Sequence, residues 1–62
     1  MDIRNQSDFN DKLYQAEYAF DHMDWRTALG YFQACLQYAK GKGMLTAYIE
    51  MKIADCKEKL NI

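Results

Sequence analysis

The sequence predicts an all-α fold: one domain over residues 1–62, built as a three-helix antiparallel bundle. Proline is absent, glycine occurs three times and half of the residues are hydrophobic, a composition that favours helices over disorder. Apolar residues recur at helical spacing in three stretches. The breaks between them are short, so neighbouring helices should pack antiparallel. We expect helices at about 8–22, 25–40 and 44–60.

The first predicted helix begins after Ser7 or Asp8, because either side chain can accept hydrogen bonds from the free amides of a helix start. Its apolar residues recur at steps of four, three, four and three, which places them in one stripe. This stripe should pack against the second helix. Its members are Phe9, Leu13, Ala16, Phe20 and Met23.

The second predicted helix begins after Asp24, which suits an N-cap and carries a charge that complements the positive helix end. Lys40-Gly41-Lys42-Gly43 is typical of a helix end, with lysines near the negative pole and a glycine free to take positive φ. This segment does not match the phosphate-binding pattern GxxxxGK[ST]. The apolar stripe comprises Trp25, Ala28, Leu29, Phe32, Cys35, Leu36 and Ala39.

The third predicted helix carries a main apolar stripe and a second, smaller row beside it. The main stripe comprises Leu45, Ile49, Ile53, Cys56 and Leu60, flanked by Ala47 and Ala54. The solvated face comprises Glu50, Lys52, Asp55, Lys57, Glu58 and Lys59. The smaller row comprises Met44, Tyr48 and Met51. This row is either the flank of a wide core face or a contact surface for another molecule.

Charge is unevenly distributed along the chain although the net charge is only −1. Residues 1–24 hold six acids and two bases, a balance of −4, and residues 25–62 hold three acids and six bases, a balance of +3. The overall balance gives no reason to expect nucleic acid or an acidic membrane as partner. Opposite halves of two molecules would attract each other, which is compatible with a homodimer.

The cysteines do not predict a metal or cofactor site. Cys35 and Cys56 lie 21 residues apart without a CxxC pair, and His22 is the only histidine. Two buried thiols in a reducing cytoplasm are favoured over a disulfide between the second and third helices. The polar start of the chain and the lack of about 20 consecutive apolar residues predict neither a signal peptide nor a membrane span.

The stretch 16–36 resembles a tetratricopeptide repeat. The small and large residues of that repeat have counterparts in Ala16, Trp25, Ala28, Phe32 and Cys35. Small side chains let two helices cross closely, and bulky rings fill the space one turn further on. The resemblance covers one repeat, with the third helix as a C-terminal cap. The hairpin also alternates Ala and Tyr, and the charged third helix ends in Lys57-Glu58-Lys59-Leu60. In these features the chain resembles the microtubule-interacting and transport domain, a three-helix bundle.

Both resemblances imply binding of peptides or helices from other proteins. By resemblance to the repeat, the ligand face of the first helix would comprise Leu13, Glu17, Phe20 and Asp21. Further aromatic candidates on that helix are Tyr14 and Tyr18, since amphipathic rings commonly anchor interfaces. Burial of Met44, Tyr48 and Met51 would instead complete a homodimer.

Other classes of function fit the sequence less well. Catalysis needs convergent titratable groups in a pocket, and so short a chain has little volume for a cleft, so we expect no enzyme activity. Lys52, Lys57 and Lys59 alternate with acids along the third helix, which makes nucleic-acid binding a weak alternative. The sequence therefore predicts a protein–protein interaction module.

Overall fold

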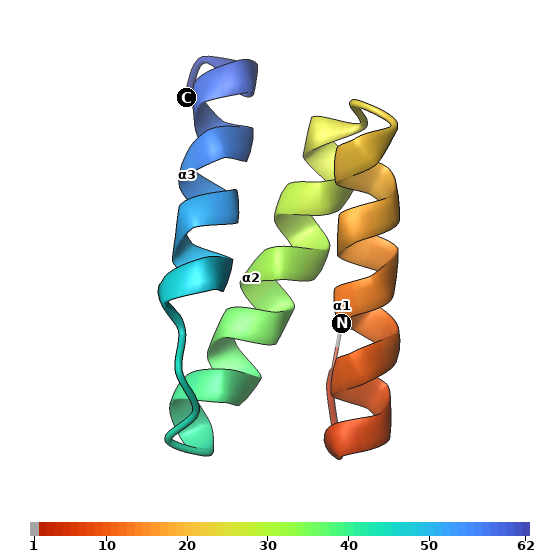
Figure 1. Ribbon diagram of the computed structural model, residues 1–62, viewed down its shortest axis with the longest axis vertical. Coiled ribbons are helices and arrows are strands. Elements are labelled where there is room, and N and C mark those ends of the chain that lie inside the picture. The colour runs from red at the N-terminus through yellow and green to blue at the C-terminus, as the bar shows by residue number, and fades with distance from the viewer. Residues whose placement is uncertain (1) are drawn as a thin grey trace.

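The chain folds into three helices and no strands over residues 2–62, the part described by the computed structural model. Helix α1 spans Gln6–Asp21, α2 spans Trp25–Gly41 and α3 spans Ala47–Leu60. Successive helices run in opposite directions (Figure 1). The predicted all-α, three-helix antiparallel bundle is thus confirmed, and the second helix matches its predicted range to within one residue at its end.

Helix α2 lies between the other two and packs extensively against both (Figure 1). Because α2 faces neighbours on two sides, its inward residues are fully buried, and Phe32 is among the largest of these side chains. The core draws on all three helices and comprises Phe9, Ala16, Ala19, Ala28, Phe32, Cys35, Ala39, Ile49, Ile53 and Cys56.

The small residues of the α1–α2 hairpin lie inside, as the sequence predicted. Ala16, Ala28 and Cys35 are each 0% exposed. Because these side chains are short, the two helices approach closely, and the ring of Phe32 fills the remaining space. Trp25 is half-buried at the start of α2 and packs on the edge of this core.

Helix α1 begins two residues earlier than the sequence predicted. The N-cap is Asn5, whose Oδ1 accepts a hydrogen bond of 2.8 Å from the backbone N–H of Asp8. The Asp8 carboxylate in turn accepts from the backbone N–H of Arg4 at 3.3 Å. Ser7 and Asp8 are therefore first-turn residues, and the prediction of either as the cap was wrong because Asn5 can cap equally well.

A residue with left-handed backbone follows each helix: Met23 at φ 62°, Gly43 at φ 69° and Asn61 at φ 62°. After α2, the N–H of Met44 donates to the carbonyl of Ala39 at 2.9 Å, as in a Schellman motif. Met23 was predicted to join the apolar stripe of α1, but its left-handed backbone ends the helix and leaves its side chain exposed.

Helix α3 begins three residues later than predicted, at Ala47. The turn that ends α2 uses the N–H of Met44, so residues 44–46 must reverse the chain before a new helix can start. Leu45 lies in this turn and is 96% exposed, so its predicted place in the core was wrong. Thr46 precedes the helix and its Oγ1 donates to Glu50 Oε2 at 2.6 Å.

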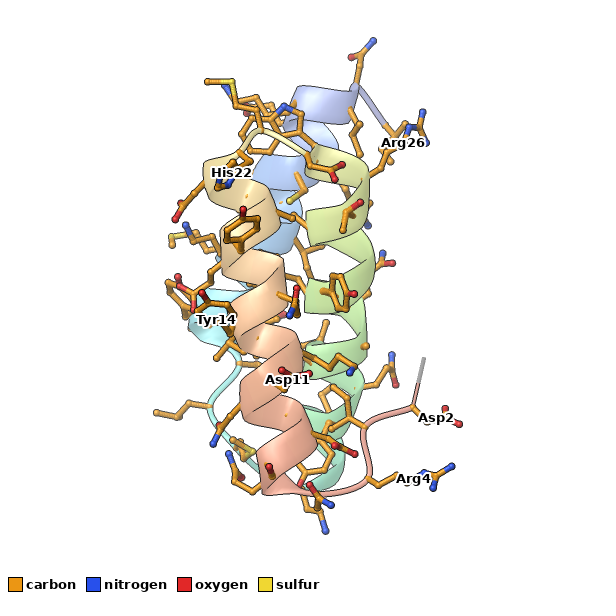
Figure 2. The ribbon with its side chains drawn as sticks, turned by 90° about the vertical axis from the view of Figure 1, so that its right-hand side faces the viewer. Asp2, Arg4, Asp11, Tyr14, His22 and Arg26 are labelled. Carbon is orange, nitrogen blue, oxygen red and sulfur yellow. The ribbon has the colours of Figure 1, made fainter. Side chains whose placement is uncertain are left out.

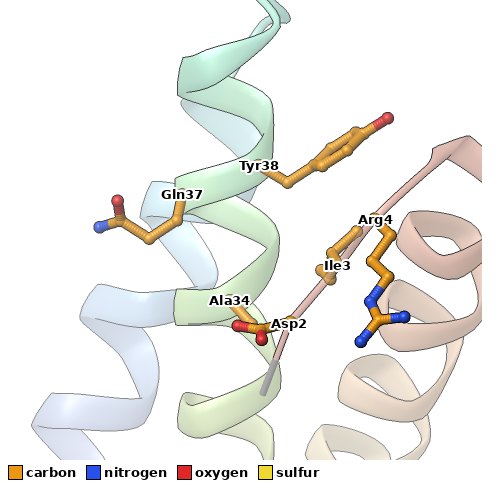
Figure 3. A pocket seen from close by; sticks show the side chains of 6 residues that line it. All are labelled: Asp2, Ile3, Arg4, Ala34, Gln37 and Tyr38. Carbon is orange, nitrogen blue, oxygen red and sulfur yellow. The ribbon is translucent and has the colours of Figure 1, made fainter.

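The segment before α1 is extended and lies beside α2, with Ile3 half-buried against the core (Figure 3). Figure 2 shows Asp2 and Arg4 on the α2 side of α1, while Tyr14 lies on the other side. Ile3 was not among the residues predicted to form the core. Its one signal was an isolated apolar residue in a polar start, which helical periodicity does not detect.

No helix within residues 2–62 combines the length and the apolar character needed to cross a bilayer.

Candidate protein-binding surface

Helices α1 and α3 meet at a seam of polar side chains. The hydroxyl of Tyr48 on α3 donates to Oε1 of Glu17 on α1 at 2.7 Å. One turn along, the ammonium of Lys52 lies 3.9 Å from the ring centroid of Phe20 and 5.5 Å from that of Tyr48. The sequence predicted that Lys52 lies on a solvated face. Its side chain instead lies over the ring of Phe20, and Lys52 is half-buried.

Negative charge dominates the surroundings of the Tyr48 hydroxyl. The hydrogen bond to Glu17 raises the Tyr48 pKa from 10.0 to about 12, and partial desolvation and the charges of Glu17 and Asp21 act in the same direction. Ionising the phenol would remove its donor and place a second negative charge beside the carboxylate. At neutral pH the phenol is therefore a fixed donor, and Asp21 lies near enough to act on it.

Phe20 belongs to the core edge rather than to an open surface. Its ring meets Trp25 edge-on at a centroid distance of 5.0 Å and Phe32 at 6.3 Å. Leu13 is also half-buried against the core. Both residues were predicted to touch a ligand. The structure places Phe20 under the Lys52 ammonium and packs Leu13 against the core.

Three large aromatic or apolar side chains beside the seam are exposed. On α1, Tyr14 is 65% exposed, and on α3, Tyr48 and Met51 are 46% and 53% exposed. Tyr14 and Asp21 stand three residues before and four after Glu17, so they flank it on the helix surface. We call Tyr14, Glu17, Asp21, Tyr48 and Met51 the seam surface. All five were predicted site residues.

Two further predicted site residues lie off the seam surface. Tyr18 is 55% exposed and stacks on His22, with ring centroids 4.1 Å apart and an interplanar angle of 25°. His22 Nδ1 lies 2.8 Å from the Tyr18 carbonyl oxygen. Met44 is half-buried against the core, because it follows the end of α2. The predicted row of Met44, Tyr48 and Met51 is thus divided between core and surface.

Two pockets are lined in part by α2. Beside the N-terminal segment there is a pocket of about 540 Å³, lined by Asp2, Ile3, Arg4, Ala34, Gln37 and Tyr38 (Figure 3). Between α2 and α3 there is one of about 460 Å³, whose lining includes Gly30, Gln33, Ile53 and Lys57. The first lining holds the titratable side chains Asp2, Arg4 and Tyr38, and the second holds Lys57. Neither lining includes a histidine or a cysteine.

Both cysteines are free, fully buried thiols. Burial raises the pKa of Cys35 to about 11, with Glu17 adding to the effect, and burial likewise raises the pKa of Cys56. The thiolate is the reactive form, so both groups are poor nucleophiles at neutral pH. Among residues 2–62, no three His, Cys, Asp or Glu side chains are grouped to hold a metal ion.

In comparisons with protein-family models, curated proteins and solved structures, nothing matches this chain.

Proposed function

We propose that this chain is a protein–protein interaction module that holds a peptide or helix of another protein on the seam surface. The observation that carries this proposal is the exposure of Tyr14, Tyr48 and Met51 around a polar contact that joins two helices. Aromatic residues and methionine are enriched in protein interfaces. Contiguous exposed apolar residues on a small chain commonly mark such contacts.

The seam also supports the proposal through its rigidity. Tyr48 is held by Glu17, and Lys52 is held over Phe20, so these side chains have little freedom left to lose when a partner arrives. Ordering flexible side chains opposes association, and a surface ordered in advance avoids part of that cost. The Tyr14 hydroxyl has no hydrogen-bond partner within residues 2–62, and the side chain is 65% exposed.

The resemblance to the tetratricopeptide repeat supports the same surface. We propose that α1 and α2 form one repeat-like hairpin and that α3 takes the place of the first helix of a next repeat. The buried small residues Ala16, Ala28 and Cys35 fit this assignment. In that family the first helices line the ligand groove, and here the corresponding helices are α1 and α3, which form the seam.

We propose a binding role without catalysis. The two thiols are buried and protonated at neutral pH. His22 stacks on Tyr18 at the end of α1, away from either cysteine in sequence and outside both pockets. Catalytic sites require such groups to converge on a cavity, and this arrangement does not supply that convergence.

Site-specific photocrosslinking tests the binding surface. A photoreactive phenylalanine analogue replaces Tyr14 in one variant and Met51 in another, and each is expressed in the cells of origin. We expect both to form a covalent adduct with the same partner protein. Gln33 on the outer side of α2 is the matched control, since it is also exposed. Adducts from Gln33 alone would contradict the proposal.

Self-association through the same surface is the second candidate, favoured by the opposite charges of residues 1–24 and 25–62. Sedimentation equilibrium separates the two candidates. A monomer over the full concentration range supports a foreign partner, whereas a dimer that Met51→Glu dissociates supports self-association.

A further inference from the structure

Helix α3 has a face that no other helix covers within residues 2–62. Figure 1 shows α3 at the edge of the molecule, with α2 on one side of it. Its buried residues Ile49, Ile53 and Cys56 face inward. The opposite side carries residues that recur at steps of four, three and four, and all are exposed: Ala47, Met51, Ala54 and Glu58. We call these four residues the outer stripe of α3.

The outer stripe combines small and large side chains, which suits close packing of another helix. Met51 stands between Ala47 and Ala54 and is 53% exposed. When two α3 helices run antiparallel and overlap along their full length, Ala47 of one copy lies level with Leu60 of the other. Met51 of each copy then lies beside Ala54 of the other, so a long side chain fills the space over a short one.

The charges on one flank of the outer stripe select this antiparallel direction. Glu50 and Lys57 lie about two turns apart on that flank, and both are exposed. In the antiparallel pair Glu50 of each copy is level with Lys57 of the other, and twofold symmetry forms this contact twice. A parallel pair would instead place Glu50 beside Glu50 and Lys57 beside Lys57. Thr46 Oγ1 donates to Oε2 of Glu50 at 2.6 Å, which leaves Oε1 to accept from the lysine.

The remaining charged residues of α3 have defined places in the same pair. Asp55 of each copy is level with Lys52 of the other, on the opposite flank, although Lys52 also lies over an aromatic ring of its own chain. Lys59 has no charged residue level with it. Glu58 is the exception, because it is level with Glu50 of the other copy and repels it. Each half of the pair thus has two attractive contacts and one repulsive contact.

The pair gains apolar contact at its ends, but it remains small. Leu45 and Ile62 are 96% and 72% exposed and stand before and after α3, so they come to the same end of the antiparallel pair from different copies. One helix face per copy buries less than the about 800 Å² per partner of a standard interface. The dissociation constant should therefore lie at about 10 µM to 1 mM, the range of weak association.

We propose that two copies of this chain associate through the outer stripes of their α3 helices, antiparallel and related by a twofold axis. This inference rests on the second candidate function, self-association, and specifies the helix face and the direction of the pair. Of the seam surface it uses Met51, which lies within the outer stripe. Glu50 and Lys57 set the direction.

Two charge reversals test the pair in the full chain. Glu50→Lys and Lys57→Glu are prepared as separate variants, and sedimentation equilibrium up to about 2 mM chain measures their dissociation constants, alone and mixed. We expect each variant alone to dimerise about threefold to tenfold more weakly than the wild type, because each reversal brings like charges together twice. An equimolar mixture should recover the wild-type affinity, since a mixed pair again holds two opposite-charge contacts.

Two further variants make the test specific. Lys40→Glu is the matched control, because it reverses a lysine in the last turn of α2 and makes the same change in net charge on a different helix. It should dimerise as the wild type does. Glu58→Gln removes the repulsive contact and should tighten the dimer by about twofold to threefold. Circular dichroism checks that every variant remains helical.

The outcomes separate this inference from self-association in general. A monomer at every concentration rejects both the α3 pair and the second candidate, and leaves the foreign-partner proposal to the crosslinking experiment. A dimer that neither reversal weakens excludes the antiparallel α3 pair, while self-association through another face stands. Equal weakening by Lys40→Glu, or no recovery in the mixture, would show that net charge rather than the contact of Glu50 with Lys57 is responsible, and would overturn the inference.

Discussion

Met23 shows how one residue ends a helix at an energetic cost. Its backbone has φ 62°, a left-handed conformation that places Cβ close to the following carbonyl oxygen in any residue with a side chain. The Met23 side chain is exposed and so recovers little through packing. The position that follows α2 in the same way is occupied by glycine, which adopts this conformation without that penalty.

We expect Met23→Gly to raise the free energy of unfolding by about 0.5–1 kcal/mol, because relief of the strained conformation exceeds the added freedom of the unfolded chain. Urea denaturation with unchanged m-value measures the effect. Met23→Ala is the control and should give no gain, since alanine keeps the Cβ. Equal stabilisation by both changes would show that exposure of the methionine, not its backbone, is unfavourable.

Tyr48 should make the stability of the fold depend on alkaline pH. A free phenol side chain has a pKa of 10.0 and Tyr48 in the folded chain has a pKa of about 12, so its contribution is fully present below pH 10. That contribution is lost as pH rises through about 12, because the folded state resists losing the proton. We expect the stability difference between wild type and Tyr48→Phe to shrink over this window.

Unfolding by urea at a series of pH values measures that difference, and the ultraviolet absorbance of tyrosinate follows the titration directly. One tyrosine of the five should ionise late in the wild type, and the late step should be missing in Tyr48→Phe. A constant difference across the window would mean that the bond to Glu17 does not persist in solution.

The presence of three helices could be predicted from the sequence, because apolar residues recur at helical spacing over several turns, as they do from Ala28 to Ala39. Helix starts could not be fixed equally well. Asn5 and Ser7 are both good caps, and the choice depends on which side chain reaches a free amide. The start of α3 was mispredicted for another reason. Leu45 fits the periodic apolar pattern, but it lies in the turn before the helix and is exposed.

The two possible caps of α1 give a direct test. Asn5→Ala removes the acceptor of the Asp8 amide and should lower the free energy of unfolding by about 1 kcal/mol. Ser7→Ala should change it by less than about 0.5 kcal/mol, because Ser7 is an exposed first-turn residue. Thermal or urea unfolding compares the two variants. A larger loss from Ser7→Ala would place the helix start where the sequence alone suggested.

The position of Tyr14 and Tyr48 outside the main apolar stripes could be predicted from the sequence, but the contacts of the candidate surface could not. Exposed tyrosines on α1 and α3 follow from periodicity, since they fall outside the apolar stripes. The pairing of Glu17 with Tyr48 joins residues 31 positions apart and depends on how α1 and α3 are rotated about α2. The same rotation brings Lys52 over Phe20, which a charge pattern along one helix cannot reveal.

At the scale of the whole molecule, stability depends on one central helix. A chain of 62 residues has a total free energy of unfolding of about 3–9 kcal/mol by the usual value per residue. Phe32 of α2 is 0% exposed and is among the largest of the fully buried side chains. Small folds of this kind unfold in one cooperative step.

We expect Phe32→Ala to cost about 3–5 kcal/mol, enough to unfold most molecules or to leave a small margin. Labelling of Cys35 and Cys56 by a thiol reagent measures this, because both thiols are inaccessible in the folded state. Both should react slowly in the wild type and together in Phe32→Ala. Tyr14→Ala, at an exposed position, should retain slow labelling, and fast labelling of only one cysteine would contradict a single cooperative unit.

The central position of α2 has a consequence for how such a protein diversifies. Selection for a foldable chain constrains the buried residues of α2, because this helix packs against both of the others. The outward positions of α1 and α3, such as Tyr14 and Met51, are exposed and are not constrained by packing in this way. Substitutions at these positions could therefore alter the proposed binding surface, while the scaffold beneath it stays the same.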